Sequence, residues 1–296
     1  DAIAAAWKAR RDAGEEVGKP PLNPEQRGGG GGFLQHARLR ASMQARGATA
    51  AEIDAAVVAA GIDRVTAVVG PGGTGKSAMV HALDVEFVAS ACGYLLVSAY
   101  TGVAAAPFGG PTLLSLLNLS IESKSATRVQ QLSPAEREVA CKKFFAECGV
   151  QVRDIGGLVL DEVSFLELVM FGHVDARLQQ LTGNTGVLCG GIPLLLCGDN
   201  HQKAPPGGTM WCKELVVNAV EDGAIAAGGA SVAKARGIGL LQQARRVELK
   251  RLMRAEGDTQ FIEIQLKMRR TDLAQPVDGA FVRLLRPPSA ADLAVD

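Results

Sequence analysis

Four short runs of apolar residues lie along the middle of the chain and determine its predicted architecture. The runs cover residues 64–69, 94–98, 157–160 and 192–197. Nearly continuous apolar runs of this length predict strands that are buried on both faces, because a half-exposed strand alternates apolar and polar residues. Residues 77–90 have the pattern of a helix. Buried strands that alternate with helices predict an α/β fold, in which a parallel β-sheet has helices on both faces.

The remaining segments interrupt this alternation. Residues 1–21 are Ala-rich, end in a Gly/Pro break and are predicted to form an N-terminal tail. The five glycines of residues 28–32 follow no predicted strand, so we expect a flexible loop there, before a helical region at residues 33–60. The Ser-rich residues 120–133 and the Ala/Gly-rich residues 219–239 have no clear apolar stripe. We expect both of these segments to be surface insertions.

The charge balance excludes one class of nucleic-acid binder. The chain has 296 residues, enough for one sizeable core, and its 31 Lys and Arg residues equal its 31 Asp and Glu residues. A neutral chain does not hold DNA or RNA with its whole surface, so any such contact must be local. Residues 234–270 are strongly basic, with ten Lys or Arg against four Asp or Glu. We expect residues 245–254 to form a solvated helix face, with phosphate contact as the alternative.

Cysteine spacing and hydropathy indicate an intracellular chain without a membrane span. The six cysteines form no C-x-x-C pair, so we expect reduced and mostly buried thiols. No run of 18 apolar residues occurs in the sequence. The chain begins with Asp1, and residues 1–11 lack the apolar core of a secretory signal. We expect an intracellular location: the nucleus or mitochondrion of a eukaryote, and otherwise the cytoplasm.

The first candidate for chemistry follows the first predicted strand and opens the next helix. Residues 70–77 read Gly-Pro-Gly-Gly-Thr-Gly-Lys-Ser, a full G-x-x-x-x-G-K-S pattern, or P-loop. Glycines let backbone N–H groups turn inward around phosphate oxygens, and the helix N-terminus adds positive potential. The lysine supplies a charge to the β- and γ-phosphates, and the serine hydroxyl is a Mg²⁺ ligand. The residues predicted to bind a nucleoside triphosphate are Gly70, Gly72, Gly73, Thr74, Gly75, Lys76 and Ser77.

Two further predicted strands end in polar residues that suit nucleotide hydrolysis. The third strand runs into Asp161 and Glu162, and this is where P-loop NTPases carry their metal-side acid. We assign Asp161 and Ser77 to Mg²⁺, and Glu162 to the orientation and deprotonation of the attacking water. The fourth strand is followed by Gln202, whose neutral amide can sense the γ-phosphate. His201 has no partner at ligand spacing, so we expect it to be a loop residue.

The order of these motifs resembles that of the superfamily-one DNA helicases of the Pif-one and RecD branch. The similarity extends over about residues 22–270 and combines several blocks, which makes it more specific than any one of them. The similar blocks are residues 22–27 (adenine reading, with Gln26 in the glutamine position), 70–77 (the P-loop), 98–113 (contacts to single-stranded DNA), 160–164 (the Asp-Glu-Ile-Ser block), 198–206 (the third motif) and 249–269 (which carries Arg254).

The resemblance implies an ATP-dependent DNA helicase that uses ATP and Mg²⁺. It implies a RecA-like P-loop NTPase domain at residues 22–275, and 5′-to-3′ movement in DNA repair, recombination or telomere maintenance. Single-stranded DNA is the implied partner of a chain that acts as a monomer. The family also has a second RecA-like domain, which supplies an arginine finger. We expect residues 276–296 to be a linker and the second domain to be missing, so that the chain is half a motor.

The resemblance also assigns roles to residues. The implied catalytic residues are Lys76, Glu162, Gln202 and Arg254, and the implied DNA contacts are Tyr100, Thr101, Gly102 and Thr112. Arg254 would reach the γ-phosphate, and Gln26 would read adenine. Tyr100 and Phe108 are equally suited to stacking on bases and to packing beneath their loop.

Departures from the family pattern leave a second hypothesis open. Leu114 stands where the family usually has His, Lys203 and Ala204 displace the prolines of the third motif, and Ala255 replaces Gln. With a missing second domain, these changes favour a catalytically weak or degenerate P-loop fragment that binds nucleotide or nucleic acid. The intact P-loop and acidic pair favour an active ATPase. A small-molecule kinase is a third hypothesis, which the third motif and Gln26 do not support.

Overall fold

The centre of the protein is a parallel β-sheet. The computed structural model describes residues 22–119, 133–202 and 229–253, and the chain divides into two compact units, Asp1–Arg251 and Leu252–Asp296. All elements discussed here belong to the first unit. Within the described residues the sheet has five strands in the order β2-β3-β4-β1-β5. The strands are β1 (Val65–Val69), β2 (Tyr94–Ala99), β3 (Ile155–Asp161), β4 (Leu194–Gly198) and β5 (Ala244–Glu248).

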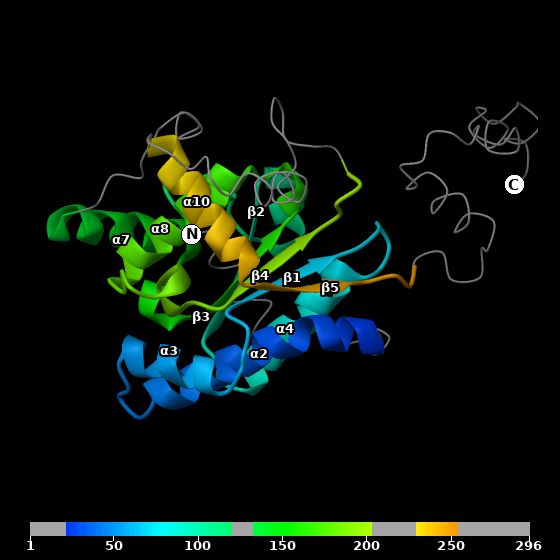
Figure 1. Cartoon of the computed structure of the whole chain (residues 1–296), viewed down its shortest axis with the longest axis horizontal. Helices are drawn as coiled ribbons and strands as arrows, with labels where there is room; N and C mark the ends of the chain where they lie inside the picture. The colour runs from blue at the N-terminus through cyan, green and yellow to red at the C-terminus, as the bar shows by residue number, and fades with distance from the viewer. Residues whose placement is uncertain (1–21, 120–132, 203–228, 254–296) are drawn as a thin grey trace, which may run out of the picture. The chain divides into compact units, whose positions relative to one another are not determined.

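Helices cover both faces of this sheet, with α2 and α4 on one side and α7, α8 and α10 on the other (Figure 1). One apolar core lies on each face. The longer helices are α2 (Pro24–Gln44), α3 (Ala50–Ala59), α4 (Lys76–Ala89), α7 (Pro134–Cys148), α8 (Leu168–Thr182) and α10 (Gly229–Gln242). The short ones are α5 (Gly102–Ala105), η1 (Ala106–Phe108), α6 (Leu113–Leu116), η3 (Val152–Asp154), η4 (Val163–Phe165) and η5 (Leu188–Gly191).

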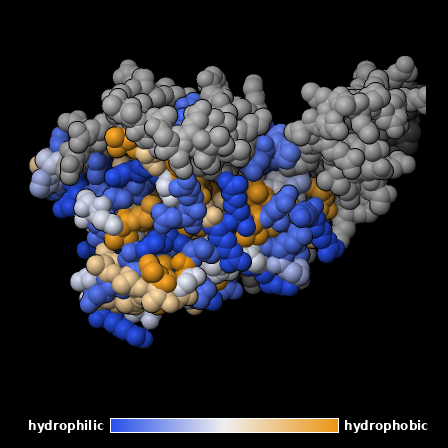
Figure 2. Space-filling model, in the orientation of Figure 1, coloured by the Kyte–Doolittle hydropathy of each residue, from blue (hydrophilic) through white to orange (hydrophobic). Residues whose placement is uncertain are grey.

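The architecture confirms the predicted α/β fold. All four predicted strands form, and β1, β3 and β4 are buried almost throughout, as their apolar runs require. The five described cysteines are free, and four of them are buried. Over the described residues, no helix combines the length and the hydropathy needed to cross a membrane. The face seen in Figure 2 carries small apolar patches separated by hydrophilic residues. The predicted domain boundary at residue 275 lies outside the described residues and stays a prediction.

The fifth strand was not predicted. Residues 245–248 were expected within a basic helix face, but they belong to β5, which pairs with β1 at the edge of the sheet. Arg245 and Arg246 are exposed there, whereas the central strands carry apolar residues. An edge strand is open to solvent on one side, and charged side chains protect it from pairing with other chains. The prediction of a helix face at this point was therefore wrong.

The prediction of a flexible loop at residues 28–32 was also wrong. The five glycines lie inside α2, which begins with a capping box formed by Asn23 and Gln26. A Cβ atom on Gly29 would lie only 3.1 Å from Val68 Cγ2, and one on Gly30 would lie 3.1 Å from Leu83 Cδ2. Glycine lowers helix propensity, but here it lets α2 approach the sheet and α4 closely. Packing has outweighed propensity.

The second half of the predicted insertion at residues 219–239 is helical as well. Residues 229–239 belong to α10, which packs against α8. A Cβ atom on Gly237 would collide with the carbonyl oxygen of Leu168, and one on Gly172 with that of Ala233. Close contact between the two helix backbones therefore depends on both glycines. The other predicted insertion, at residues 120–133, lies almost entirely outside the described residues, as do residues 219–228.

A buried carboxylate adds a polar connection to the same helix pair. Asp175 of α8 is 2% exposed. Its Oδ1 accepts a hydrogen bond of 2.7 Å from the N–H of Cys189 in η5 and one of 3.0 Å from Nε2 of Gln179. Its Oδ2 lies 3.2 Å from Nη1 of Arg236 in α10. Asp175 thus joins α8, α10 and η5 by charge-assisted bonds.

We expect the free energy of unfolding to fall by about 2 kcal/mol between pH 7 and pH 5 because of His36. His36 is 3% exposed, and burial, aided by the charge of Arg40, lowers its pKa from 6.5 to about 4. The unfolded chain therefore takes up a proton first as the pH falls. This contribution of His36 to the free energy of unfolding is present above pH 6.5 and is lost as the pH falls towards 4.

Urea unfolding at the two pH values measures this effect. The variant His36→Gln should lose stability at pH 7 through packing but should show a smaller pH dependence. The exposed His201 supplies the control, since His201→Gln should keep the wild-type pH dependence. An unchanged pH dependence in His36→Gln would show that His36 is not responsible.

Candidate nucleotide-binding site

The P-loop occupies the turn between β1 and α4. Gly75 has a left-handed backbone, with φ of 82°, and stands at the N-cap of α4, where a side chain would be strained. Thr74 is completely buried, and its hydroxyl donates to the carbonyl of Pro71 at 2.9 Å. Lys76 lies across the loop and donates to the carbonyls of Gly70 at 2.7 Å and Pro71 at 3.0 Å. The ammonium group therefore lies beside the loop backbone that would surround a phosphate.

Gln26 packs against the P-loop from the start of α2. It is 4% exposed, and its Nε2 donates to the carbonyl of Thr74 at 3.0 Å. Its Oε1 accepts from the N–H of Asn23 at 2.9 Å and so completes the capping box. Both Nε2 and Oε1 of Gln26 are thus hydrogen-bonded to the protein backbone. Adenine reading by Gln26 would replace these bonds, and it stays a prediction.

Sequence reasoning did not find this link between Gln26 and the P-loop. A signal for half of it was present, because Asn23-Pro-Glu-Gln26 has the spacing of a capping box, which predicts that the amide turns back on its own helix. The contact with Thr74 spans 48 positions of the sequence and depends on how α2 packs on the sheet.

The two predicted carboxylates leave the sheet at the same edge as the P-loop. β3 ends at Asp161, and burial raises the pKa of this carboxyl, while the nearby charge of Lys76 acts in the opposite direction. Glu162 follows with φ of 53° and ψ of 40°, a left-handed conformation. A non-glycine residue held there costs about 1–3 kcal/mol and is typical of functional sites. The N–H of Glu162 donates to Oδ1 of Asp161 at 2.9 Å.

The predicted DNA-contacting segment starts at the end of β2, next to these acids. Ala99 is paired with both Asp161 and Thr112, so the loop returns to the strand that it leaves. Thr101 caps α5, which begins at Gly102, and its Oγ1 lies 3.2 Å from Oε2 of Glu162. The structure therefore brings the predicted DNA-contacting segment into direct contact with the carboxylate that is predicted to act in hydrolysis.

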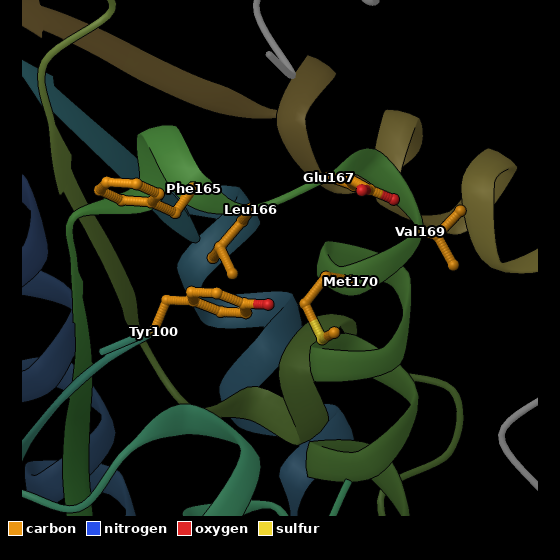
Figure 3. A pocket seen from close by; sticks show the side chains of 6 residues that line it. All are labelled: Tyr100, Phe165, Leu166, Glu167, Val169 and Met170. Carbon is orange, nitrogen blue, oxygen red and sulfur yellow. The ribbon is translucent and has the colours of Figure 1, made fainter. Parts of the chain in front are cut away.

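The aromatic residues of this segment are packed against protein. Phe108 is 4% exposed, and its ring centroid lies 5.0 Å from that of His81. Tyr100 lines a small pocket, and Figure 3 shows its ring extending towards Leu166 and Met170. The pocket is lined by Tyr100, Phe165, Leu166, Glu167, Val169 and Met170. The contacts of Phe108 therefore support packing beneath the loop. Tyr100 contacts the pocket with one side of its ring.

The other predicted site residues are placed in part. Ser77 is exposed in the first turn of α4. Gln202 is also exposed, and its N–H donates to the carbonyl of Asp199 just beyond β4. The carbonyl of Gly198 accepts from the N–H of Gly70 at 3.1 Å, so the end of β4 adjoins the P-loop. Arg254 lies outside the described residues.

A further side of the site was not predicted. The N–H of Leu249, just after β5, donates to the carbonyl of Val69 at 2.8 Å. A Cβ atom on Gly70 would lie 2.5 Å from the carbonyl oxygen of Leu249, so these two backbones touch. Oε2 of Glu25 accepts from the N–H of Lys250 at 2.8 Å. The start of α2 and the end of β5 therefore meet beside the P-loop. This contact was not predicted because β5 itself was not predicted.

A P-loop on β1, with an acidic pair at the end of β3, defines the class of this protein as a nucleotide-binding P-loop protein with a RecA-like α/β fold. A model of the PIF1-like helicase family matches residues 44–220, which is more than half of the chain. The chain belongs to the PIF1-like helicase family.

Individual relatives agree with this assignment. The ATP-dependent DNA helicase PIF1 of Saccharomyces cerevisiae (strain YJM789) is 25% identical over 225 residues, covering 74% of this chain and 22% of that protein. The crystal structure of Pif1 helicase from Candida albicans superposes with a TM-score of 0.57 at 22% identity, over 92% of this chain and 49% of that one.

Two further solved structures have the same fold. A structure of two coordinating Pif1 helicases at forked double-stranded DNA gives a TM-score of 0.52 at 17% identity, over 90% of this chain and 51% of that one. The crystal structure of Bacteroides sp. Pif1 in complex with ADP-AlF4 gives a TM-score of 0.51 at 17% identity, over 83% of this chain and 45% of that one. The chain thus spans about half the length of these solved chains and less than a quarter of the yeast relative.

Proposed function

We propose that the chain is the ATP-binding first motor domain of an ATP-dependent DNA helicase. One observation carries the proposal: Lys76 lies across the P-loop and close to Asp161, while Glu162 is next to both Asp161 and the predicted DNA-contacting segment. A triphosphate on the loop would therefore have a positive charge, a metal-side acid and a candidate base around it. Phosphoryl transfer to water needs mainly such positioning and charge stabilisation.

Each residue of the site has a defined part in this mechanism. When a triphosphate binds, Lys76 exchanges its bonds to the carbonyls of Gly70 and Pro71 for bonds to phosphate oxygens. Glu162 orients the attacking water and accepts its proton. Gln202, beyond β4, senses the γ-phosphate. The roles of Gln26 in adenine reading and of Arg254 at the γ-phosphate are proposed from the family resemblance alone.

The residues present suit Mg²⁺ bound together with a nucleotide. Among the described residues, no group of three or more His, Cys, Asp or Glu could hold a metal ion. Mg²⁺ is usually bound by one or two carboxylates together with water and phosphate oxygens, so a single acid and a hydroxyl fit it better than they fit a metal caged by protein. Asp161 and Ser77 would hold the ion, which would neutralise charge on the phosphates.

Single-stranded DNA is the proposed partner, bound by the loop of residues 100–112. Tyr100, Thr101, Gly102 and Thr112 are the proposed contacts, and local contact of this kind agrees with a chain of zero net charge. One relative of the same fold is described at forked double-stranded DNA. Movement in the 5′-to-3′ direction, and work in repair, recombination or telomere maintenance, are proposed from the family resemblance.

Titration calorimetry with ATP and Mg²⁺ tests the nucleotide site. The wild-type chain should bind, and Lys76→Ala should weaken binding by about 10- to 100-fold, because it removes charge-assisted bonds to phosphate. Lys142→Ala on the exposed face of α7 is the matched control and should bind like the wild type. A finger arginine from another domain is typically worth about 10³–10⁵ in rate, so hydrolysis measured without such a domain should be slow. Equal binding by Lys76→Ala and the wild type would contradict the proposal.

A further inference from the structure

We propose that Thr101 is a positioning residue that holds Glu162 in a resting position, and that single-stranded DNA on the loop of residues 100–112 releases it. Hydrolysis would then depend on DNA. The inference rests on the proposed function and goes beyond it, because it names the contact through which the DNA loop regulates the hydrolytic carboxylate.

The contact follows from the topology of the sheet. β2 and β3 are parallel neighbours with Ala99 opposite Asp161, so the residues that follow both strands leave the sheet side by side. Thr101 and Glu162 are 61 positions apart in sequence, yet Oγ1 of Thr101 donates to Oε2 of Glu162 at 3.2 Å. The bond therefore joins the two segments to which DNA contact and water activation are assigned.

The Thr101 hydroxyl has two partners. It donates to Glu162, and it accepts from the N–H of Ala104 at 3.3 Å as the N-cap of α5. α5 has only four residues, and Val103 on it is 87% exposed, so the helix presents its outer face to solvent. Single-stranded DNA that binds to this outer face can turn α5 and its N-cap residue, Thr101, together. Such a turn would take the hydroxyl away from the carboxylate.

Two features hold the carboxylate of Glu162 where it lies, its strained backbone and its bond from Thr101. Glu162 has a left-handed backbone, and such strain persists only where surrounding contacts hold it. The hydrogen bond from Thr101 occupies Oε2 of Glu162, so this oxygen is not free to orient a water molecule. Breaking the bond from Thr101 would leave Oε2 available as a base without moving Asp161 or the P-loop.

Packing around the contact connects it to the same loop. Tyr100, beside Thr101, lines the small pocket together with Phe165 and Leu166, which belong to the turn that Glu162 begins (Figure 3). The N–H of Phe165 donates to the carbonyl of Glu162 at 3.1 Å. A base that displaced Tyr100 would therefore disturb both partners of the hydrogen bond.

Single-turnover hydrolysis by the 296-residue chain, with and without a short oligo(dT), tests the inference. Thr101→Val keeps the shape and removes the hydroxyl, so the DNA-free rate should rise about tenfold, as expected for the loss of one hydrogen bond to a charged group. The stimulation by oligo(dT) should fall by the same factor, and the concentration of ATP that gives half the maximal rate should not change. Thr101→Ser, which restores the hydroxyl, should behave like the wild type.

The chain offers a matched control. Thr49 caps α3, and its hydroxyl donates to Oε2 of Glu52 at 2.8 Å, the same pair of groups in an exposed position. Thr49→Val should leave the DNA-free rate and the stimulation unchanged. An unchanged DNA-free rate in Thr101→Val, or a fall in that rate, would overturn the inference. Failure of the proposed function is recognised separately, because the wild type would then neither bind nor hydrolyse ATP.

Discussion

Replacing Glu162 with Gln is expected to lower the rate of Mg-ATP hydrolysis by about 10²- to 10⁴-fold, the typical contribution of a general base. The amide has nearly the shape of the carboxylate but accepts no proton at neutral pH. Nucleotide binding should persist, because Lys76 and the loop backbone that would surround the phosphates are untouched by the change. Glu162→Gln should therefore separate hydrolysis from binding, whereas Lys76→Ala should weaken binding itself.

The measurement is single-turnover hydrolysis with the chain in excess over labelled ATP, which resolves slow rates, together with calorimetry for binding. Glu138→Gln is the control: Glu138 is an exposed acid on α7 that pairs with Lys142 at 2.8 Å. The variant Glu138→Gln should hydrolyse ATP at the wild-type rate. If Glu162→Gln were as fast as the wild type, Glu162 would not be the base. The hypothesis of a degenerate P-loop module that only binds nucleotide or nucleic acid would then be favoured.

The positions of the candidate site residues could be predicted largely because these residues lie at the ends of buried strands. The apolar runs before Gly70, Asp161 and Gln202 identify strands β1, β3 and β4, and parallel strands bring their carboxyl ends to one edge of the sheet. The contact between Thr101 and Glu162 could have been predicted only with the order of the strands. That order places β2 beside β3, and nothing in the local pattern of either strand reveals it.

The glycine-rich helices could not be predicted from local pattern. Glycine reduces helix propensity and adds nothing to an apolar stripe, so both α2 at residues 28–32 and α10 at residues 229–239 had the local signature of loops. Their stability comes from close contact with other elements, such as that of Gly29 with Val68 or of Gly237 with Leu168. This contact is a property of the folded chain, and a sequence pattern does not contain it.

The contact between α8 and α10 leads to the second large prediction: Gly237→Ala should destabilise the fold by about 3 kcal/mol. The added methyl group would collide with the carbonyl oxygen of Leu168 and would lie 3.1 Å from the N–H nitrogen of Gly172. Backbone atoms cannot turn away as a flexible side chain can, so the two helices must separate.

Gly239 in the same helix provides a control with the opposite sign. A Cβ atom on Gly239 would meet nothing within 4 Å, so Gly239→Ala should gain about 0.5–1 kcal/mol from helix propensity alone. Urea unfolding of the two variants measures the difference. Leu168 is the first residue of α8 and follows Glu167 of the pocket, so separating the helices should also disturb the turn that begins at Glu162. If both variants were more stable than the wild type, residues 229–239 would form a helix without close contact to α8, as a surface insertion would.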